Sequence, residues 1–321
     1  MNNNRLYQFD LCRVICVIWI VGFWHLQYYL SESYRLQGVV YEYCKIITNC
    51  ILACFTFLSG FFLSKYTFSS KSDISMFYKK RLFRFFPLLL ASVLSLVCIG
   101  GGHVSQIIPT MFGYSLFMSR PIQTLWYFSM LILFYFLTPI LKFTTSNQTK
   151  ITWRGIFIIL FVAISLKYAD IRLLMYFPFY VIGLNIEKDS FLKIIKRKFC
   201  FVWLLLFFIS LVCAYNGMYV CMYVCMYVCM FSGVLCLLSL SMSLYHPMIE
   251  RTITVLAYAS MCAYLFHRQL YGIIVFCIRY FSSIDYMPLL AAICSVCVLF
   301  GISWFVQFQY DKLVKKYVNG Y

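Results

Sequence analysis

The residues best able to do chemistry begin with three ionisable side chains near the N-terminus. Asp10, Arg13 and His25 interrupt an apolar stretch, where ionisable groups are costly and mark candidate functional sites. Asp10 and Arg13 are three residues apart, so on a helix they share one face and can pair. That pair is either functional or an anchor at a membrane surface. His25 is either a packing residue or a group that transfers protons near neutral pH.

A second set combines two arginines with a small-residue segment. Arg81 and Arg84 lie in the basic segment from Tyr78 to Pro87, three residues apart on one predicted helix face. Two guanidinium groups at that spacing can grip phosphates, although a basic turn also anchors a membrane protein to anionic lipid. Ser59 and Gly60 close an earlier apolar stretch. The glycine there predicts close approach of another helix.

A third set lies towards the C-terminus. His267 and Arg268 again interrupt an apolar stretch. A buried arginine needs a partner or water, so the interior is expected to be hydrated at this level. Trp126 opens another apolar stretch, where it is either an aromatic-belt anchor or part of a site.

The elements that position these residues follow from composition. The chain has 321 residues, of which 63% are hydrophobic and 12% charged, with a mean hydropathy of +0.84. Soluble domains are about 45–50% apolar and about 25% charged. This composition excludes an ordinary cytosolic enzyme, a disordered chain and a nucleic-acid-binding domain. It predicts an all-α polytopic membrane bundle.

Spans of about 20 apolar residues are needed to cross a bilayer. Ten candidate spans cover most of the chain, so residues 1–321 are expected to form a single integral-membrane domain. The candidates are 8–30, 46–64, 86–101, 123–141, 153–169, 172–187, 199–216, 218–245, 253–279 and 288–309.

The basic residues indicate how the spans are oriented. The net charge is +17, but 19 of the 27 Lys and Arg residues lie between spans on the side that holds both termini, against six on the other. The positive-inside rule then places both termini in the cytoplasm, with the lipid bilayer as partner and no nucleic acid. The first apolar stretch is too long for a cleaved signal peptide and is expected to remain as a span.

Sixteen cysteines and four histidines show no zinc-type spacing. Because nearly all the thiols lie in apolar runs, they are expected to be structural, and no metal is expected. Residues 218–229 repeat Met-Tyr-Val-Cys three times. On a helix this places Cys221, Cys225 and Cys229 on one face and the tyrosines on another, either as a metal or redox stripe or, as we favour, as a span lengthened by duplication.

These motifs, in this order, resemble the membrane acyltransferase-3 family, bacterial integral-membrane enzymes that mostly O-acetylate glycans. The resemblance covers most of the chain. It rests on Phe9-Asp10-Leu11-Cys12-Arg13 leading to His25, Phe57-Leu58-Ser59-Gly60-Phe61, Phe77 through Arg81 and Arg84 to Pro87, Leu125-Trp126-Tyr127-Phe128, and Ser260 through Tyr264-Leu265 to His267.

The resemblance implies transfer of an acetyl group from acetyl-CoA, as co-substrate, to a hydroxyl of a cell-surface saccharide or its lipid-linked precursor in the inner (cytoplasmic) membrane. His25 would be the general base, with Arg13 and Asp10 also catalytic. Arg81, Arg84 and Ser59 would bind acetyl-CoA, and His267, Arg268 and Trp126 the acceptor. Either Arg13 or Arg268 would stabilise the oxyanion.

One departure from the family pattern concerns spacing. Eleven residues separate Arg13 from His25 where the family usually has ten. One extra residue turns a helix by about 100°, which would point the two side chains in different directions. A local π-bulge would restore the register.

Other classes of function fit part of the sequence. A glycan or lipid transporter or flippase also needs many spans and buried polar residues, but no repeat relates the two halves and no matched broken helices are found. A polysaccharide polymerase would need large external loops. An assembly subunit would leave His25 and Arg268 without a role.

Overall fold

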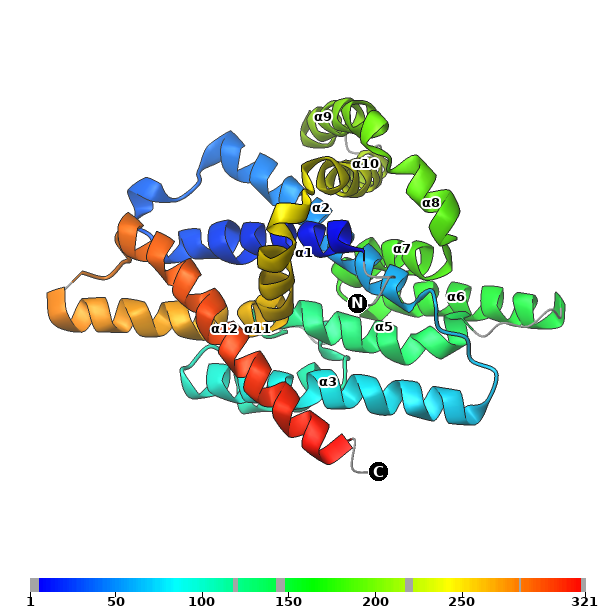
Figure 1. Ribbon diagram of the computed structural model, residues 1–321, viewed down its shortest axis with the longest axis horizontal. Helices are drawn as coiled ribbons and strands as arrows, with labels where there is room; N and C mark the ends of the chain where they lie inside the picture. The colour runs from blue at the N-terminus through cyan, green and yellow to red at the C-terminus, as the bar shows by residue number, and fades with distance from the viewer. Residues whose placement is uncertain (1–5, 118–120, 143–147, 217–221, 283, 319–321) are drawn as a thin grey trace. The chain divides into compact units, whose positions relative to one another are not determined.

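The computed structural model describes all residues except 1–5, 118–120, 143–147, 217–221, 283 and 319–321. Within this described part, every regular element is a helix, and no strand is present (Figure 1). The predicted all-α class is therefore confirmed.

The chain divides into two compact units. Unit 1 consists of residues 1–55 and 188–321, and unit 2 of residues 56–187. The long helix α2 (Gly38–Leu63) begins in unit 1 and ends in unit 2.

Unit 1 is assembled from segments far apart in sequence. Helix α1 packs against α10 and α11, α9 packs along α10, and α11 packs along α12. A π-helical turn and a short 3-10 turn continue α1 without a break to Tyr29. Besides the start of α2, its helices are α1 (Tyr7–Trp19), α8 (Lys188–Ile194), α9 (Cys200–Asn216), α10 (Met222–Leu244), α11 (Glu250–Ser282) and α12 (Leu289–Val318).

Unit 2 is built from consecutive helices. Helix α4 packs against α3 and α5, and α7 packs against α5 and α6. Besides the end of α2, its helices are α3 (Lys71–Cys98), α4 (Ile107–Met111), α5 (Trp126–Lys142), α6 (Gln148–Tyr168) and α7 (Ile171–Asn185).

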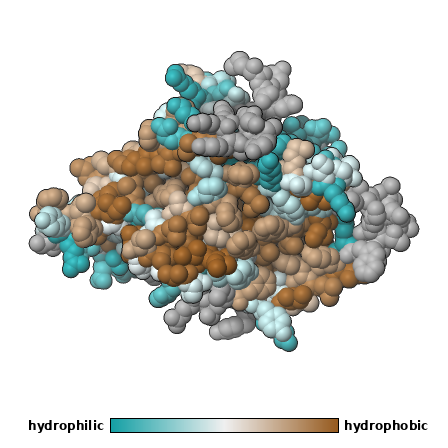
Figure 2. Space-filling model, turned by 90° about the horizontal axis from the view of Figure 1, so that it is seen from below, coloured by the Kyte–Doolittle hydropathy of each residue, from teal (hydrophilic) through white to brown (hydrophobic). Residues whose placement is uncertain are grey.

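Seven helical segments in the described residues are long and apolar enough to cross a membrane, and α5 and α7 are shorter apolar helices. Hydrophobic side chains cover much of the face in Figure 2. Phe201 on α9 and Leu290 on α12 are about three-quarters exposed, which suits lipid and not water. The chain is a multi-pass membrane protein. Each of the ten predicted spans falls on a helix, while the number of crossings stays a prediction.

Several helices extend beyond their apolar stretch. The third predicted span, 86–101, corresponds to α3, which already begins at Lys71. A capping box starts it: the Ser70 hydroxyl accepts from the Asp73 amide, and the Asp73 carboxylate accepts from the Ser70 amide. The basic segment is therefore helical and not a turn, because the backbone ladder continues through polar residues.

Gly60 lies where α2 and α7 come into close contact within unit 2. A Cβ at Gly60 would overlap the carbonyl oxygen of Tyr180, and one at Gly183 would overlap that of Phe57. The two glycines thus allow the backbones to touch from both sides, as small residues do between membrane helices. The predicted close approach at Gly60 is confirmed.

The described part of the Met-Tyr-Val-Cys repeat lies on α10. Cys229 is buried, whereas Tyr223 is 60% exposed and Tyr227 is 37% exposed. The cysteines and tyrosines described here therefore lie on different faces of α10, as predicted, and the cysteine face is the more buried of the two. Cys221 lies outside the described residues.

Replacing Gly60 with alanine is expected to destabilise the protein by about 1–3 kcal/mol, because the methyl group forces two backbones apart. Thermal unfolding of the purified protein in detergent measures this. Gly155→Ala on α6 is the matched control, since nothing lies within 4 Å of a Cβ there. An unchanged or raised melting temperature for Gly60→Ala would contradict the close contact.

Candidate functional site

Arg13 fixes α1 on α11 within unit 1. Its guanidinium Nη2 donates to the carbonyl oxygen of Ala257 at 3.1 Å and to the hydroxyl of Ser260 at 3.0 Å. Its Nη1 lies 3.5 Å from a carboxylate oxygen of Asp10, so the predicted i,i+3 pair is present. The Asp10 side chain is only 10% exposed. Both charges are thus satisfied inside the protein, which lowers the cost of burying them.

A π-helical turn of the kind that would restore the register lies between Arg13 and His25. Residues Ile20–His25 form a π-helical turn, which takes up the additional residue of this span. As a result Arg13 and His25 both face α11, at two levels roughly 18 Å apart along the helix axis. The helices run in the same direction, since Arg13 meets Ala257 and His25 meets His267.

His25 and His267 form a stacked pair. Their ring centroids are 4.9 Å apart and the planes differ by only 3°. Tyr264 and Tyr271 meet the His267 ring edge-on, at 5.8 and 6.0 Å between centroids. Tyr29 packs in turn on Tyr271. The two imidazoles therefore sit against aromatic walls supplied by both helices.

The proton on His267 can be assigned from its bonding. Nδ1 lies 2.8 Å from the carbonyl oxygen of Tyr264, which can only accept, so Nδ1 carries the proton and Nε2 has a free lone pair. Three buried nitrogen atoms here have no hydrogen-bond partner among the described residues: Nε2 of His267, Nδ1 of His25 and Nε of Arg268. Buried polar atoms are normally paired, so a cluster of three is a candidate substrate site.

Arg268 adds a positive charge beside this pair. Its guanidinium interacts electrostatically with both imidazoles. Its backbone carbonyl accepts from the Tyr29 hydroxyl at 3.4 Å. An unpaired guanidinium N–H next to two imidazoles is suited to stabilise negative charge on a reacting oxygen.

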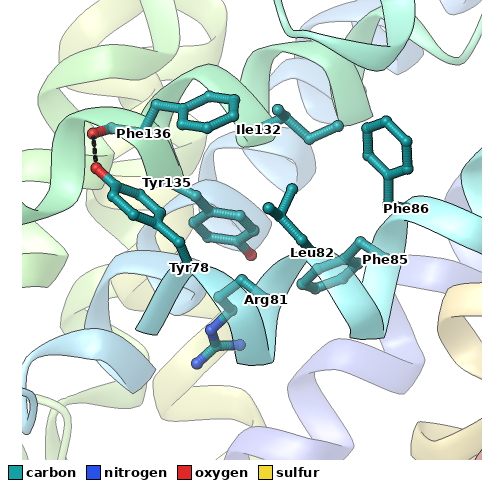
Figure 3. Close-up of a pocket in the computed structure, with 8 residues that line it drawn as sticks. All are labelled: Tyr78, Arg81, Leu82, Phe85, Phe86, Ile132, Tyr135 and Phe136. Carbon is teal, nitrogen blue, oxygen red and sulfur yellow. Dashed lines mark hydrogen bonds between the residues drawn. The ribbon is translucent and has the colours of Figure 1, made fainter. Parts of the chain in front are cut away.

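Arg81 and Arg84, the two arginines predicted to bind phosphates, have different surroundings in unit 2. The Arg81 guanidinium carbon lies 5.7–5.8 Å from the ring centroids of Tyr66, Phe77 and Tyr135, within cation–π range of all three. Arg81 also lines a pocket with seven apolar and aromatic residues of α3 and α5 (Figure 3). Its guanidinium points away from the Leu82 and Phe86 end of that pocket. Arg84 is exposed and does not line it.

Ser59 and Trp126, the remaining predicted site residues, also lie in unit 2. Ser59 is half-buried near the end of α2. Trp126 begins α5, with the Tyr176 ring stacked at 6.0 Å and the Arg172 guanidinium carbon 4.4 Å from its centroid. Trp126 is therefore held by protein contacts on α7.

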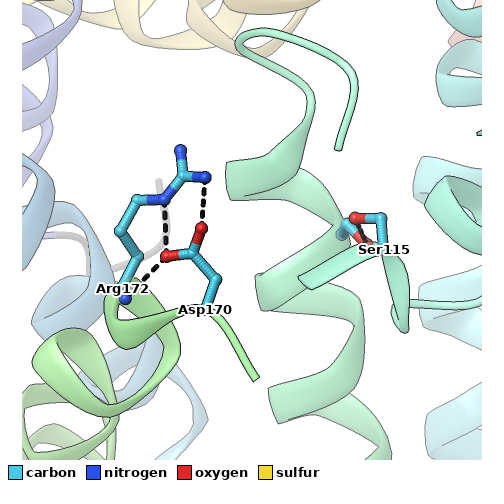
Figure 4. Close-up of polar contacts among 4 residues, drawn as sticks. Ser115, Asp170 and Arg172 are labelled. Carbon is cyan, nitrogen blue, oxygen red and sulfur yellow. Dashed lines mark hydrogen bonds and ion pairs between the residues drawn. The ribbon is translucent and has the colours of Figure 1, made fainter. Parts of the chain in front are cut away.

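Asp170 forms an ion pair with Arg172 and caps the N-terminus of α7. Its carboxylate accepts from Nε and Nη2 of Arg172 at 2.8 and 2.6 Å, and from the Arg172 backbone amide at 2.9 Å (Figure 4). Burial favours the protonated acid, but these bonds outweigh it and hold the pKa of Asp170 below its usual range. Ser115, which is labelled in the same view, donates to the Ser129 hydroxyl at 2.7 Å.

Comparison with known proteins identifies the family. The family model described as an acyltransferase domain matches residues 6–308, which is nearly the whole chain. The chain belongs to the acyltransferase-3 family. It is therefore a membrane acyltransferase. No curated protein and no solved structure gives a significant match.

Some aromatic residues that contact the candidate site residues of this acyltransferase were not predicted from the sequence. Tyr271 follows His267 by four residues, so it shares a face of α11 with it, and its hydroxyl donates to the carbonyl of Val21 at 3.2 Å. The i,i+4 spacing from His267 could have indicated Tyr271 from the sequence. Tyr66 and Tyr135, which surround Arg81, come from separate elements and carry no such signal.

Replacing Asp170 with alanine is expected to cost about 1 kcal/mol, the typical loss of an N-cap. Asparagine should cost less, because it retains the cap and loses only the ion pair. Since the pKa of Asp170 is lowered on folding, its ionic contribution is present above the unfolded value of about 3.9 and is lost as the pH falls through the folded value.

Thermal unfolding in detergent at neutral and acidic pH measures these differences. Asp285→Ala is the control, because its ion pair with Arg279 is about three-quarters exposed. Equal melting temperatures for Asp170→Ala and wild type at pH 7 would contradict this role.

Proposed function

We propose that this acyltransferase moves an acetyl group from acetyl-CoA to a hydroxyl of a cell-surface saccharide or its lipid-linked precursor, with His25 as general base. The stacked His25–His267 pair is the observation that carries the proposal. The whole chain acts as one domain in the cytoplasmic membrane, with both termini in the cytoplasm. The transfer uses no metal.

The unpaired nitrogen atoms support a division of roles. His25 removes the proton of the acceptor hydroxyl, whose oxygen attacks the thioester carbonyl carbon. The carbon–sulfur bond then breaks, and the CoA thiolate takes up the proton that His25 holds. His267 presents the lone pair of Nε2, which can accept a hydrogen bond from a neighbouring hydroxyl of the saccharide and so orient the acceptor.

Arg268 is favoured over Arg13 as the group that stabilises the oxyanion. Arg13 already bonds Ala257, Ser260 and Asp10, and it lies roughly 18 Å along the helix from His25. The Nε of Arg268 has no hydrogen-bond partner among the described residues and lies next to His267 in sequence. In this mechanism Arg13 and Asp10 position α1, while Arg268 faces the developing charge.

Arg81 and Arg84 bind the phosphates of acetyl-CoA in this proposal, and Ser59 contributes a further contact to the donor. Arg81 is held by aromatic rings, and its charge has no carboxylate partner in the described residues. An anionic ligand would supply that partner. Arg84, which is exposed, contributes a second contact. Trp126 remains the proposed contact for the saccharide.

His25→Ala is expected to lower acetyl transfer by about 10²- to 10⁴-fold, the usual contribution of a general base. The measurement is the mass shift of one acetyl group on the cell-surface glycan, compared at equal protein abundance. His246→Ala, in an exposed loop, is the matched control and should transfer normally. Wild-type acetylation by the His25 variant would rule out this base.

Arg81→Ala is expected to raise the KM for acetyl-CoA by about 10- to 100-fold with little change in kcat, since a charge-assisted hydrogen bond contributes about 1.5–3 kcal/mol. Arg84→Ala should have a smaller effect. Arg81→Lys should recover only part of the affinity, because lysine lacks the planar fork. Lys80→Ala, exposed on the same helix, is the control. An unchanged KM for Arg81→Ala would exclude a phosphate contact.

A further inference from the structure

Three cysteine thiols of unit 1 converge in its interior. Cys12 and Cys16 are one turn apart on α1, and Cys54 lies on the facing part of α2. All three residues have no exposed surface. Their sulfur atoms lie within 4.8 Å of one another, and those of Cys12 and Cys54 are 3.5 Å apart. The proposed acyl transfer uses none of them.

This spacing fits three ligands of one metal ion. Sulfur atoms bound at about 2.3 Å to a common ion lie about 4 Å apart when the three are coplanar with it. The observed separations fall around that value, so small side-chain rotations would bring the thiols to an ion. A buried thiol otherwise packs as a small hydrophobic group, which does not require three sulfur atoms to meet at one point.

The donor set and its surroundings select the kind of ion. The three ligands are all sulfur, which favours soft ions such as Cu(I) and zinc over Mg²⁺ or Ca²⁺. Structural zinc takes four ligands, and the described residues offer three here. A monovalent ion that replaces one thiol proton also leaves the site neutral, which limits the cost of burial.

We propose that Cys12, Cys16 and Cys54 form a binding site for a soft monovalent cation of the Cu(I) class. On binding, one S–H bond breaks, its proton leaves to solvent, and a sulfur–metal bond forms. The other two sulfur atoms donate lone pairs, and no electron is transferred. The bound ion would join α1 to α2, while Arg13 joins α1 to α11. The site is separate from the acyl-transfer chemistry, and this proposal does not depend on the proposed acyl transfer.

The test is a competition for Cu(I) between the purified full-length protein in detergent and a chromophoric Cu(I) chelator, without oxygen. Wild type should retain one tightly held equivalent. The Cys12→Ser, Cys16→Ser, Cys54→Ser triple variant should lose it, with affinity reduced by more than the roughly 100-fold that loss of an outer-shell partner costs.

Two paired variants serve as controls. Cys294→Ser with Cys297→Ser removes two exposed thiols of α12. Cys50→Ser with Cys229→Ser removes a second buried close pair, whose sulfur atoms are 3.9 Å apart. Both should keep the tight equivalent. A triple variant that binds Cu(I) as tightly as wild type, or loss of the equivalent in either control, would overturn the proposal.

X-ray absorption on copper-loaded wild type tests the site without any substitution, should the triple variant fail to fold. A first shell of three sulfur atoms is expected. A shell that contains nitrogen or oxygen would overturn the assignment, because the three thiols offer neither.

Discussion

Unit 1 depends on the way a single guanidinium is satisfied inside an apolar bundle. The Arg13 side chain is only 26% exposed, and its bonds to Ala257 and Ser260 set both the face and the height at which α1 packs. An unpaired charge in this environment would cost several kcal/mol. Those bonds hold the first turns of α1 against α11. They therefore fix the register in which the later residues of α1 face α11.

The stacked histidines follow from that register. His25 reaches His267 because the π-helical turn takes up one residue between the two contacts. The bond from His267 to Tyr264 then decides which nitrogen stays available. Low dielectric strengthens each of these interactions, and it also makes an unpaired polar atom expensive. Three unpaired nitrogen atoms at one place are therefore maintained at a cost to stability, which is typical of a site organised for a substrate.

Local spacing in the sequence predicted much of this arrangement. The Asp10–Arg13 pair and the close approach at Gly60 both follow from helical geometry that residue counting gives directly. The count between Arg13 and His25 showed only that a straight helix would separate the two side chains, and the structure supplies the π-helical turn. Local spacing could not predict contacts between segments that are far apart in the sequence. Arg81 and Arg84 look equivalent in sequence, yet only Arg81 meets Tyr66, Phe77 and Tyr135. The thiols of Cys12 and Cys54 are 42 residues apart, and only the packing of α1 on α2 brings them together.

The π-helical turn also affects how sequence length can vary in the first span. In a straight α-helix, one inserted residue rotates the side chains of all later residues about the helix axis. The wider turn at Ile20–His25 takes up the inserted residue locally, so the later residues keep their direction. Two chains that differ by one residue in this segment can then present the same arginine and histidine to the same partner helix. A search signature that fixes the number of intervening residues would pass over chains of this kind, and one based on their shared contacts with α11 would not.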